Sequence, residues 1–459
     1  MTRTEPGVSN ISVTGGAGGS DAFYEDLAAM GDLTDNVAGT TLGIAVTSHK
    51  YLADPNVLAS ALLNPVGVVR FEGAMLGALD GPSGLTATSA AIGLRSVALQ
   101  ATNAAYQAVD DLNAKALDAS RWLAGAAVVT MPGLAVAGVG GIAADVYLNY
   151  DGDWQKWLVE HPGMIDTILG MSPGALSALG LPTDLATLTE LIAAAYPDGD
   201  PRLISNGLDL DPRTVTPPQG LGDLMDGLDY RNGQNSDKPG EGSNIDVRAI
   251  KDANGNITGY VVDIPGTKVW NAPLMDDQNN ANDFGTNIDG IAGNETVLQE
   301  GIEQALRDAG VPRDAPVMLV GHSQGGIVAA RAANDFVNNG SYNVTHVVTA
   351  GSPVGNIPIP DSVQMLSLEN NGDVVPHLDA RENPDADNRT TVKFDNQTGT
   401  VGGNHAISGP DGQDGNYESA ARQLDSGDNP SVTRFRDSAG AFLNGTSVDS
   451  HEYKVEREP

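Results

Sequence analysis

The sequence predicts an α/β domain with a mostly parallel sheet, preceded by an all-helical region. Two observations lead to this prediction. After residue 243, short apolar, β-branched runs alternate with helical runs, as in sheets whose parallel strands are connected through helices on both faces. Before residue 150, apolar residues instead recur every three or four positions, most clearly within residues 86–123, as they do along an amphipathic helix.

At 459 residues, the chain exceeds what one hydrophobic core usually organises, so two or more domains are expected. Residues 1–20 are polar and Gly-rich and are expected to form a disordered tail. Residues 21–150 form the predicted helical domain, and residues 151–242 are expected to hold short helices and a linker rich in Gly, Pro and Asn. Residues 243–459 then form the predicted α/β domain.

In the helical domain, a first helix is expected near residues 21–30, and prolines are expected to break the helices at Pro55, Pro65 and Pro82. Small residues dominate the apolar stripe of residues 86–123, so partner helices can approach it closely. The short helices expected after this domain are 154–160, 163–171 and 185–195.

The predicted α/β domain opens with a hairpin, because residues 245–250 alternate in polarity and Asn254-Gly255 supplies a turn before residues 259–264. This hairpin is expected to add an antiparallel edge to the sheet. The remaining expected elements are strands 317–320, 344–349, 363–368 and 390–394, and helices 294–309, 325–338, 417–424 and 431–443.

The composition limits the classes of partner. The net charge of −34 argues against nucleic acid, whose phosphates require Lys and Arg, and disfavours electrostatic docking on anionic lipid. The absence of cysteine excludes disulfides, a thiol nucleophile and a Cys-based zinc site. The N-terminus lacks the basic and apolar regions of a secretory signal, so we expect either cytoplasmic localisation or secretion by a signal-peptide-independent route.

Residues 122–144 carry no charge and would be long enough to span a bilayer. Their content is mostly Ala, Gly and Val, which gain little on insertion, and Pro132 interrupts them. We therefore predict two buried, close-packed helices broken at Pro132, with membrane contact through residues 122–144, as a hairpin or a single span, as the alternative.

A candidate nucleophile lies where a strand turns sharply into a helix. Gly321-His322-Ser323-Gln324-Gly325 directly follows strand 317–320 and precedes helix 325–338. This G-x-S-x-G layout is typical of the nucleophile elbow of an α/β-hydrolase, in which the glycines make room for a strained serine. The backbone amide of Gln324 is expected to face the developing oxyanion from the start of the helix.

A second G-x-S-x-G sequence places Ser172 ahead of Pro173. Proline has no N–H, so the oxyanion donor that follows the serine would be missing. No β-branched strand precedes Ser172 either, because residues 164–169 have a helical pattern. Ser323 is therefore the predicted nucleophile.

A serine nucleophile needs a base and an orienting carboxylate, which follow it in the order acid, then histidine, in α/β-hydrolases. Asp373 lies at a turn directly after strand 363–368 and is the predicted acid, with Asp379 and Glu369 as alternatives. A plain Asn/Gly/Asp turn without a catalytic role is the other interpretation.

His405 is the predicted base, because it lies in a loop after strand 390–394 and before a helix. His346 falls inside a predicted strand, His451 lies in a charged C-terminal segment, and His377 is only four residues from Asp373. His377 is kept as an alternative base, and a solvated loop histidine as the non-catalytic interpretation of His405.

The second oxyanion donor of such enzymes comes from the loop after an early strand. Here strand 259–264 ends in Pro265-Gly266-Thr267, a turn that would present its next amide inward. The backbone N–H of Thr267 is therefore the predicted partner of the Gln324 amide. An ordinary turn is the alternative.

With these residues in place, residues ~245–445 resemble α/β-hydrolase-fold serine esterases and lipases, in particular lipase-like hydrolases of actinobacteria. The shared features are G-H-S-Q-G-G, the P-G-T turn, G-S-P-V-G at residues 351–355 and G-D-x-V-P around Asp373. The resemblance implies hydrolysis of carboxylic esters, with a small-molecule or lipid substrate, through an acyl-enzyme and without metal or cofactor.

The helical region resembles the small helical substrates of type VII secretion, fused ahead of an enzyme. Tyr106 and Asp110 match their Y-x-x-x-D/E element, as do Tyr147 and Asp151, but a W-x-G turn is absent. The resemblance implies a secretion partner for the helical domain. Two alternative functions follow: an exported toxin or effector whose helical domain serves delivery or membrane interaction, and a non-catalytic interaction protein on a hydrolase scaffold.

Overall fold

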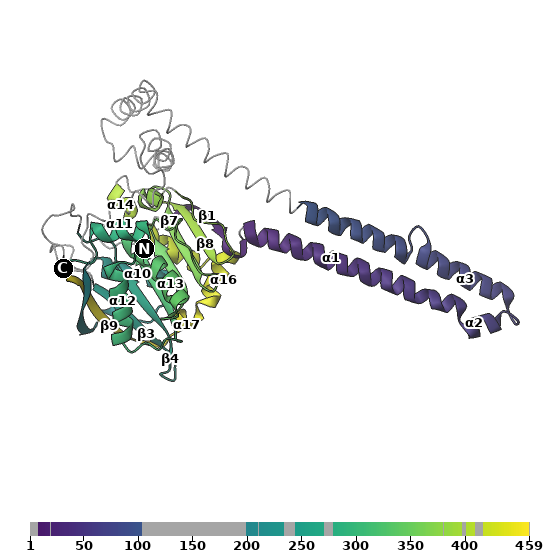
Figure 1. Ribbon diagram of the computed structural model, residues 1–459, viewed down its shortest axis with the longest axis horizontal. Helices are drawn as coiled ribbons and strands as arrows, with labels where there is room; N and C mark the ends of the chain where they lie inside the picture. The colour runs from purple at the N-terminus through teal and green to yellow at the C-terminus, as the bar shows by residue number, and fades with distance from the viewer. Residues whose placement is uncertain are drawn as a thin grey trace, which may run out of the picture. The chain divides into compact units, whose positions relative to one another are not determined.

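The computed structural model describes residues 8–18, 20–102, 199–209, 211–233, 244–269, 279–379, 381–396, 401–408 and 416–458. These residues fall into two compact units (Figure 1). Residues 21–102 form a helical unit. The other described residues form a second unit, called the sheet unit, which includes residues 8–18.

The described part of the sheet unit holds one nine-stranded sheet in the order β1-β8-β7-β6-β5-β4-β3-β9-β2. Its strands are β1 Ser9–Gly15, β2 Asp200–Leu208, β3 Asn244–Lys251, β4 Ile257–Ile264, β5 Pro316–His322, β6 Asn343–Ala350, β7 Gln364–Asn370, β8 Arg389–Asp395 and β9 Ser447–Glu458. Strands β4 to β8 run parallel, while the flanking strands pair antiparallel. The carboxyl ends of five parallel strands therefore meet at one edge of the sheet.

Helices cover both faces of this sheet. Residues of α12 and α13 pack with one face, and residues of α10, α15, α16 and α17 pack with the other. Residues 317–320 of β5 are completely buried, as expected for a central parallel strand. The helices are α9 Pro212–Val215, α10 Leu221–Gly233, α11 Phe284–Ala292, α12 Val297–Asp308, α13 Gln324–Asn339, η3 Val375–Asp379, α14 Val401–His405, α15 Asn416–Asp425, α16 Pro430–Ser438 and α17 Gly440–Leu443.

This architecture confirms the prediction of an α/β domain with a mostly parallel sheet and of a helical region ahead of it, but the edges of the sheet differ from expectation. The β3–β4 hairpin is not an edge, because β9 and β2 continue the sheet beyond β3. Strand β1 lies within residues 1–20, where a disordered tail was expected. Its polar sequence has few apolar side chains to bury. The strand is ordered because its backbone groups form hydrogen bonds with those of β8.

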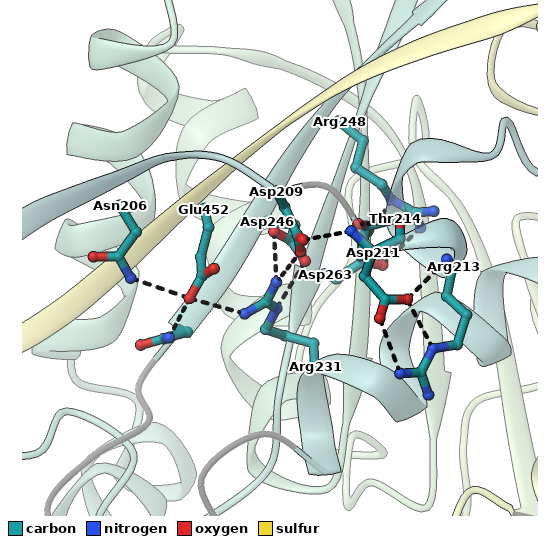
Figure 2. A network of polar contacts seen from close by, with 11 residues as sticks. Asn206, Asp209, Asp211, Arg213, Thr214, Arg231, Asp246, Arg248, Asp263 and Glu452 are labelled. Carbon is teal, nitrogen blue, oxygen red and sulfur yellow. Dashed lines mark hydrogen bonds and ion pairs between the residues drawn. The ribbon is translucent and has the colours of Figure 1, made fainter.

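A buried polar network fixes α10 against the antiparallel side of the sheet (Figure 2). Arg231 of α10 is 1% exposed, and its guanidinium contacts Asp246 of β3 at 2.7 Å, Asp209 at 2.5 Å and Glu452 of β9 at 3.1 Å. A planar guanidinium with five donors can satisfy three carboxylates at once. The network therefore sets where the C-terminal end of α10 lies.

The helical unit is a long hairpin (Figure 1). Its elements are α1 Ser20–Ser48, η2 His49–Ala53, α2 Pro55–Ser60, α3 Pro65–Asp80 and a helical stretch over residues 85–102. Two buried serines hold the outgoing and returning helices together: Ser89 Oγ donates to the carbonyl of Ala38, and Ser96 Oγ to that of Gly31, both at 2.8 Å. These contacts lie on a different face from the predicted apolar stripe, because Leu94 and Val97 of that stripe are 72% and 63% exposed.

Prolines begin helices in this unit, which explains the predicted breaks. Pro55 and Pro65 each occupy the first turn, where their missing N–H costs nothing, and Asp54 and Asn64 accept hydrogen bonds as N-caps. Pro82 lies in the short break after α3.

Across the described residues, no helix combines the length and apolar content needed to cross a bilayer. Several predictions fall outside the described part of the chain. They concern residues 122–144, the short helices within 154–195, Ser172 and the two Y-x-x-x-D elements.

Candidate active site

Ser323 lies at the sharp turn between β5 and α13, as predicted. Its backbone has φ 55° and ψ −122°, a conformation that is costly for a residue with a side chain. The Ser323 N–H donates to the carbonyl of Ala350 at 3.0 Å, and the Ser323 carbonyl accepts from Gly326 at 3.0 Å. These contacts hold the strained turn in place at the carboxyl edge of the central strand.

The three glycines around Ser323 are required by close backbone approach. A Cβ on Gly321 would lie 2.2 Å from the carbonyl oxygen of Gly325, and one on Gly325 would lie 2.1 Å from that of Ile264. A Cβ on Gly326 would lie 2.0 Å from Ser352 Oγ. A side chain at any of these positions would force the turn to open.

Asp373 and His405 meet directly, although 32 residues separate them. His405 Nδ1 lies 2.7 Å from Asp373 Oδ2, and the Asp373 carboxylate is completely buried. The same oxygen accepts a hydrogen bond of 2.6 Å from the hydroxyl of Tyr417, and Asp373 Oδ1 accepts from the Val375 N–H at 3.0 Å. Burial, and then the Asp373 carboxylate, raise the pKa of Tyr417 well above its usual range, so this phenol stays a donor.

Gly351 lies directly against the side chains of this cluster. It has φ +61°, and a Cβ there would lie 2.9 Å from Asp373 Oδ2 and from the Tyr417 hydroxyl, and 3.1 Å from His405 Nδ1. The acid and the histidine can therefore meet only because this position carries no side chain.

His322, the residue before Ser323, connects the serine turn to His405. Its Nε2 lies 2.8 Å from the carbonyl oxygen of His405, and the two imidazole centroids are 4.5 Å apart. A carbonyl only accepts, so His322 must carry its proton on Nε2. Burial, with His405 as a smaller cause, lowers the pKa of His322 well below its usual value and keeps it neutral.

His405 ends the short helix α14, where a loop was predicted, and asparagine side chains connect this helix to the turn that carries Asp373. Asn404 Nδ2 donates to the carbonyl of Gly372 at 2.8 Å, and Asn370 Nδ2 donates to the carbonyl of Asn404 at 3.0 Å. Asn416 Nδ2 donates to the carbonyl of Ala406 at 3.0 Å. These contacts fix the position of His405 relative to Asp373.

The Pro265-Gly266-Thr267 turn passes beside Ser323, as the predicted oxyanion loop should. A Cβ on Gly266 would lie 3.0 Å from Ser323 Cβ. On either side of Thr267 the amides are engaged: Gly266 N–H donates to Asn232 Oδ1 at 2.9 Å, and Lys268 N–H to the carbonyl of Asn282 at 2.7 Å. Asn232 directly follows Arg231, so the buried network of α10 also positions this turn.

The alternative histidines occupy other elements of the structure. His346 is a side chain of the sheet, bonded to Thr345 and Ser438 and packed edge-on against two phenylalanines, and burial lowers its pKa to about 4. His377 lies in η3, and His451 lies in β9, where a charged C-terminal segment was expected. In the described residues, no group of three or more His, Cys, Asp or Glu side chains is arranged to hold a metal ion.

The alternative acids have other partners. Asp379 Oδ2 accepts from the Gly355 N–H at 2.7 Å, and Glu369 Oε1 accepts from Asn383 Nδ2 at 2.6 Å. Both carboxyls are buried, and this burial raises the pKa of Asp379 to about 6 and that of Glu369 to about 7.

The raised pKa of Glu369 predicts a pH-dependent stability. Its value of about 7, against 4.5 for an unperturbed Glu, means that the folded state holds the proton more tightly. The stabilising contribution is therefore complete below pH ~4.5 and is lost as the pH rises through ~7. Glu369→Gln should match the wild type near pH 4.5 and exceed its unfolding free energy at pH 8 by about 1–3 kcal/mol. Urea unfolding at both pH values measures this, and equal pH slopes in the two proteins would contradict it.

Residues of the cluster that the sequence did not reveal are Tyr417, His322 as a linking residue, and Asn232. Tyr417 begins an amphipathic helix, where an aromatic residue is indistinguishable from ordinary core. Asn232 lies far from the serine in sequence, and its role depends on the tertiary position of α10.

A mixed sheet covered by helices on both faces, with a glycine-flanked serine at the carboxyl end of its central strand, defines an α/β-hydrolase-like domain. Residues 267–383 match the family model of lipase (class 3). The matched segment contains Ser323 and Asp373 and ends before His405. It supports a lipase- or esterase-like hydrolase. Comparisons with curated proteins and with solved structures gave no match.

Proposed function

We propose that this protein hydrolyses carboxylic esters through an acyl-enzyme on Ser323, with His405 as the base and Asp373 as the orienting acid. The observation that carries the proposal is the hydrogen bond of 2.7 Å between His405 Nδ1 and the buried carboxylate of Asp373, beside the strained turn of Ser323. A carboxylate at Nδ1 fixes the imidazole tautomer, which leaves Nε2 free to take a proton.

In the acylation step, Ser323 Oγ attacks the ester carbonyl carbon while its proton passes to His405 Nε2. The negative charge that develops on the carbonyl oxygen is accepted by the backbone amides of Gln324 and Thr267. His405 then gives its proton to the alkoxy oxygen of the leaving alcohol, and the carbon–oxygen bond breaks. Asp373 stays ionised and stabilises the transient imidazolium.

In the deacylation step, His405 takes a proton from water, and the resulting hydroxide attacks the acyl carbon. The amides of Gln324 and Thr267 again hold the oxyanion. The proton returns from His405 to Ser323 Oγ as the acid product leaves. No metal or cofactor takes part in this proposal.

The substrate is a small-molecule or lipid ester. The match of residues 267–383 to class 3 lipases supports an ester of a lipid. Rates of hydrolysis of p-nitrophenyl esters from acetate to palmitate would show which acyl chain length the protein prefers.

Active-site labelling tests the proposal. A fluorophosphonate probe should react covalently with the wild-type protein and leave Ser323→Ala unlabelled, because only an activated serine attacks phosphorus at a useful rate. Ser172→Ala removes the serine of the other G-x-S-x-G sequence and should label like the wild type. Equal labelling of wild type and Ser323→Ala would overturn the proposal.

A second candidate function is an exported effector whose helical unit serves delivery or membrane interaction. The observation that favours it is the large apolar surface that the helical unit exposes. Deleting residues 21–102 while keeping residues 8–18 should then abolish recovery of the protein from culture supernatant and leave ester hydrolysis intact. Unchanged recovery would count against this function.

A further inference from the structure

The exposed apolar side chains of the described chain are concentrated on the helical unit. Within the described residues, only three of the large exposed hydrophobic side chains lie in the sheet unit, namely Leu208, Ile257 and Leu378. All the others lie between Met30 and Val97. Such a concentration marks a surface that meets another apolar phase or partner.

The most exposed of these residues lie where the hairpin turns, between α2 and α3 (Figure 1). We define the hydrophobic tip as five side chains, two in this turn and three in the helices that flank it. Leu62 and Leu63 are 90% and 91% exposed, and Leu58, Val66 and Val69 are 51%, 62% and 67% exposed. Because Leu62 and Leu63 bury almost no apolar surface, their side chains contribute almost no hydrophobic stabilisation to the fold.

Local hydrogen bonds hold the turn that carries the tip. Asp54 Oδ1 accepts from the Asn56 N–H at 2.8 Å and caps α2, while Asn64 Oδ1 accepts from the Gly67 N–H at 3.0 Å and caps α3. The Leu63 and Asn64 amides both donate to the carbonyl of Ser60, at 3.0 and 2.9 Å. The leucines are therefore held outward on a defined turn.

Charge identifies the kind of surface that the tip fits. Residues 55–69 contain no Asp, Glu, Lys or Arg, in a chain with 18% charged residues and a net charge of −34. An acidic protein is repelled by anionic lipid, but an uncharged apolar tip can enter a neutral interface without transferring a charge. We propose that the hydrophobic tip inserts into a zwitterionic lipid surface and anchors the protein there reversibly.

The choice of lipid as occupant rests on the proposed function, because a lipid ester is presented at such a surface. The tip differs from residues 122–144, for which membrane contact was an alternative prediction from the sequence. A second copy of this chain is the competing occupant, since two apolar tips could also cover each other.

Vesicle flotation tests the proposal without any turnover. The protein carries Ser323→Ala in every sample, and the vesicles are phosphatidylcholine alone or phosphatidylcholine with phosphatidylglycerol. The test variant is Leu62→Asp with Leu63→Asp. The matched control is Leu94→Asp with Val97→Asp, since Leu94 and Val97 are 72% and 63% exposed on the returning helix of the same hairpin.

The expected result is flotation with phosphatidylcholine vesicles, at least a tenfold weaker partition for the tip variant, and unchanged partition for the control. Adding phosphatidylglycerol should weaken binding. Equal losses in both variants, no flotation at all, or a dimer that the tip variant converts to monomers without vesicle binding by the wild type would each overturn the proposal. Hydrolysis of soluble p-nitrophenyl butyrate by the catalytically intact tip variant should equal the wild type, and the absence of turnover in both would refute the proposed function alone.

Discussion

Replacing Asp373 by asparagine should lower kcat/KM for a p-nitrophenyl ester on the order of 10⁴-fold while the protein stays folded. The carboxylate accepts from His405, Tyr417 and the Val375 amide at the same time. An amide offers one acceptor oxygen and an NH₂ group. If the NH₂ faces His405, the imidazole must turn its unprotonated nitrogen toward it and place its proton on Nε2, where the base is needed.

The fold should survive because asparagine has nearly the same volume and keeps one acceptor. The control is Asp379→Asn, which alters one of the two alternative acids, whose carboxylate accepts from the Gly355 and Asn356 amides. That variant should keep kcat/KM within about tenfold of the wild type. Steady-state kinetics, with circular dichroism as the check of folding, decides the matter. If Asp373→Asn stays fully active and Asp379→Asn does not, the assigned acid is wrong.

Replacing Arg231 by methionine should reduce the unfolding free energy by about 3–5 kcal/mol. Its guanidinium is the common partner of Asp209, Asp246 and Glu452, and the first two carboxylates are 5% and 0% exposed. Methionine preserves much of the apolar stem but removes the positive charge, which leaves buried carboxylates without compensation. Part of the loss will be relieved at low pH, where these groups can take up protons.

An exposed arginine gives the matched comparison. Arg434 pairs with Asp387 at 2.5 Å, but the two side chains are 45% and 38% exposed. Arg434→Met should change the unfolding free energy by about 1 kcal/mol or less, since solvent screens such a pair. Urea unfolding of the three proteins at pH 7 measures both differences. Similar losses in the two variants would show that burial does not set the energetics of the Arg231 network.

The parallel half of the sheet could be predicted because each of its strands is a short β-branched run bounded by turn residues. The candidate site followed from chain order, since Ser323, Asp373 and His405 each come after one of these strands. The roles assigned to them remain predictions, and the 2.7 Å contact between His405 and Asp373 agrees with the acid and the base that the sequence predicts.

The hairpin turn revealed β3, but the other antiparallel strands could not be predicted in the same way. Strand β9 alternates charged residues with Tyr453 and Val455, and β1 is made of small polar residues, so neither has the composition of a buried strand. Each is ordered by pairing with a neighbour that is distant in sequence: β1 with β8, and β9 with β3 and β2. The environment of the acid was hidden for a similar reason, because Tyr417 reaches Asp373 across 44 residues.

Strand β1 changes how the chain should be divided. Strand β1, residues 9–15, is one border strand of the nine-stranded sheet, and β2 is the opposite border strand. In the sequence, the helical unit comes after β1 and before β2. In chain order, the hairpin thus comes between two strands of the same sheet, and it is not a leader that precedes the whole sheet. Removing the residues before 21 would delete the border strand β1 and expose the backbone of β8. Deleting only residues 21–102 would remove no strand of the sheet.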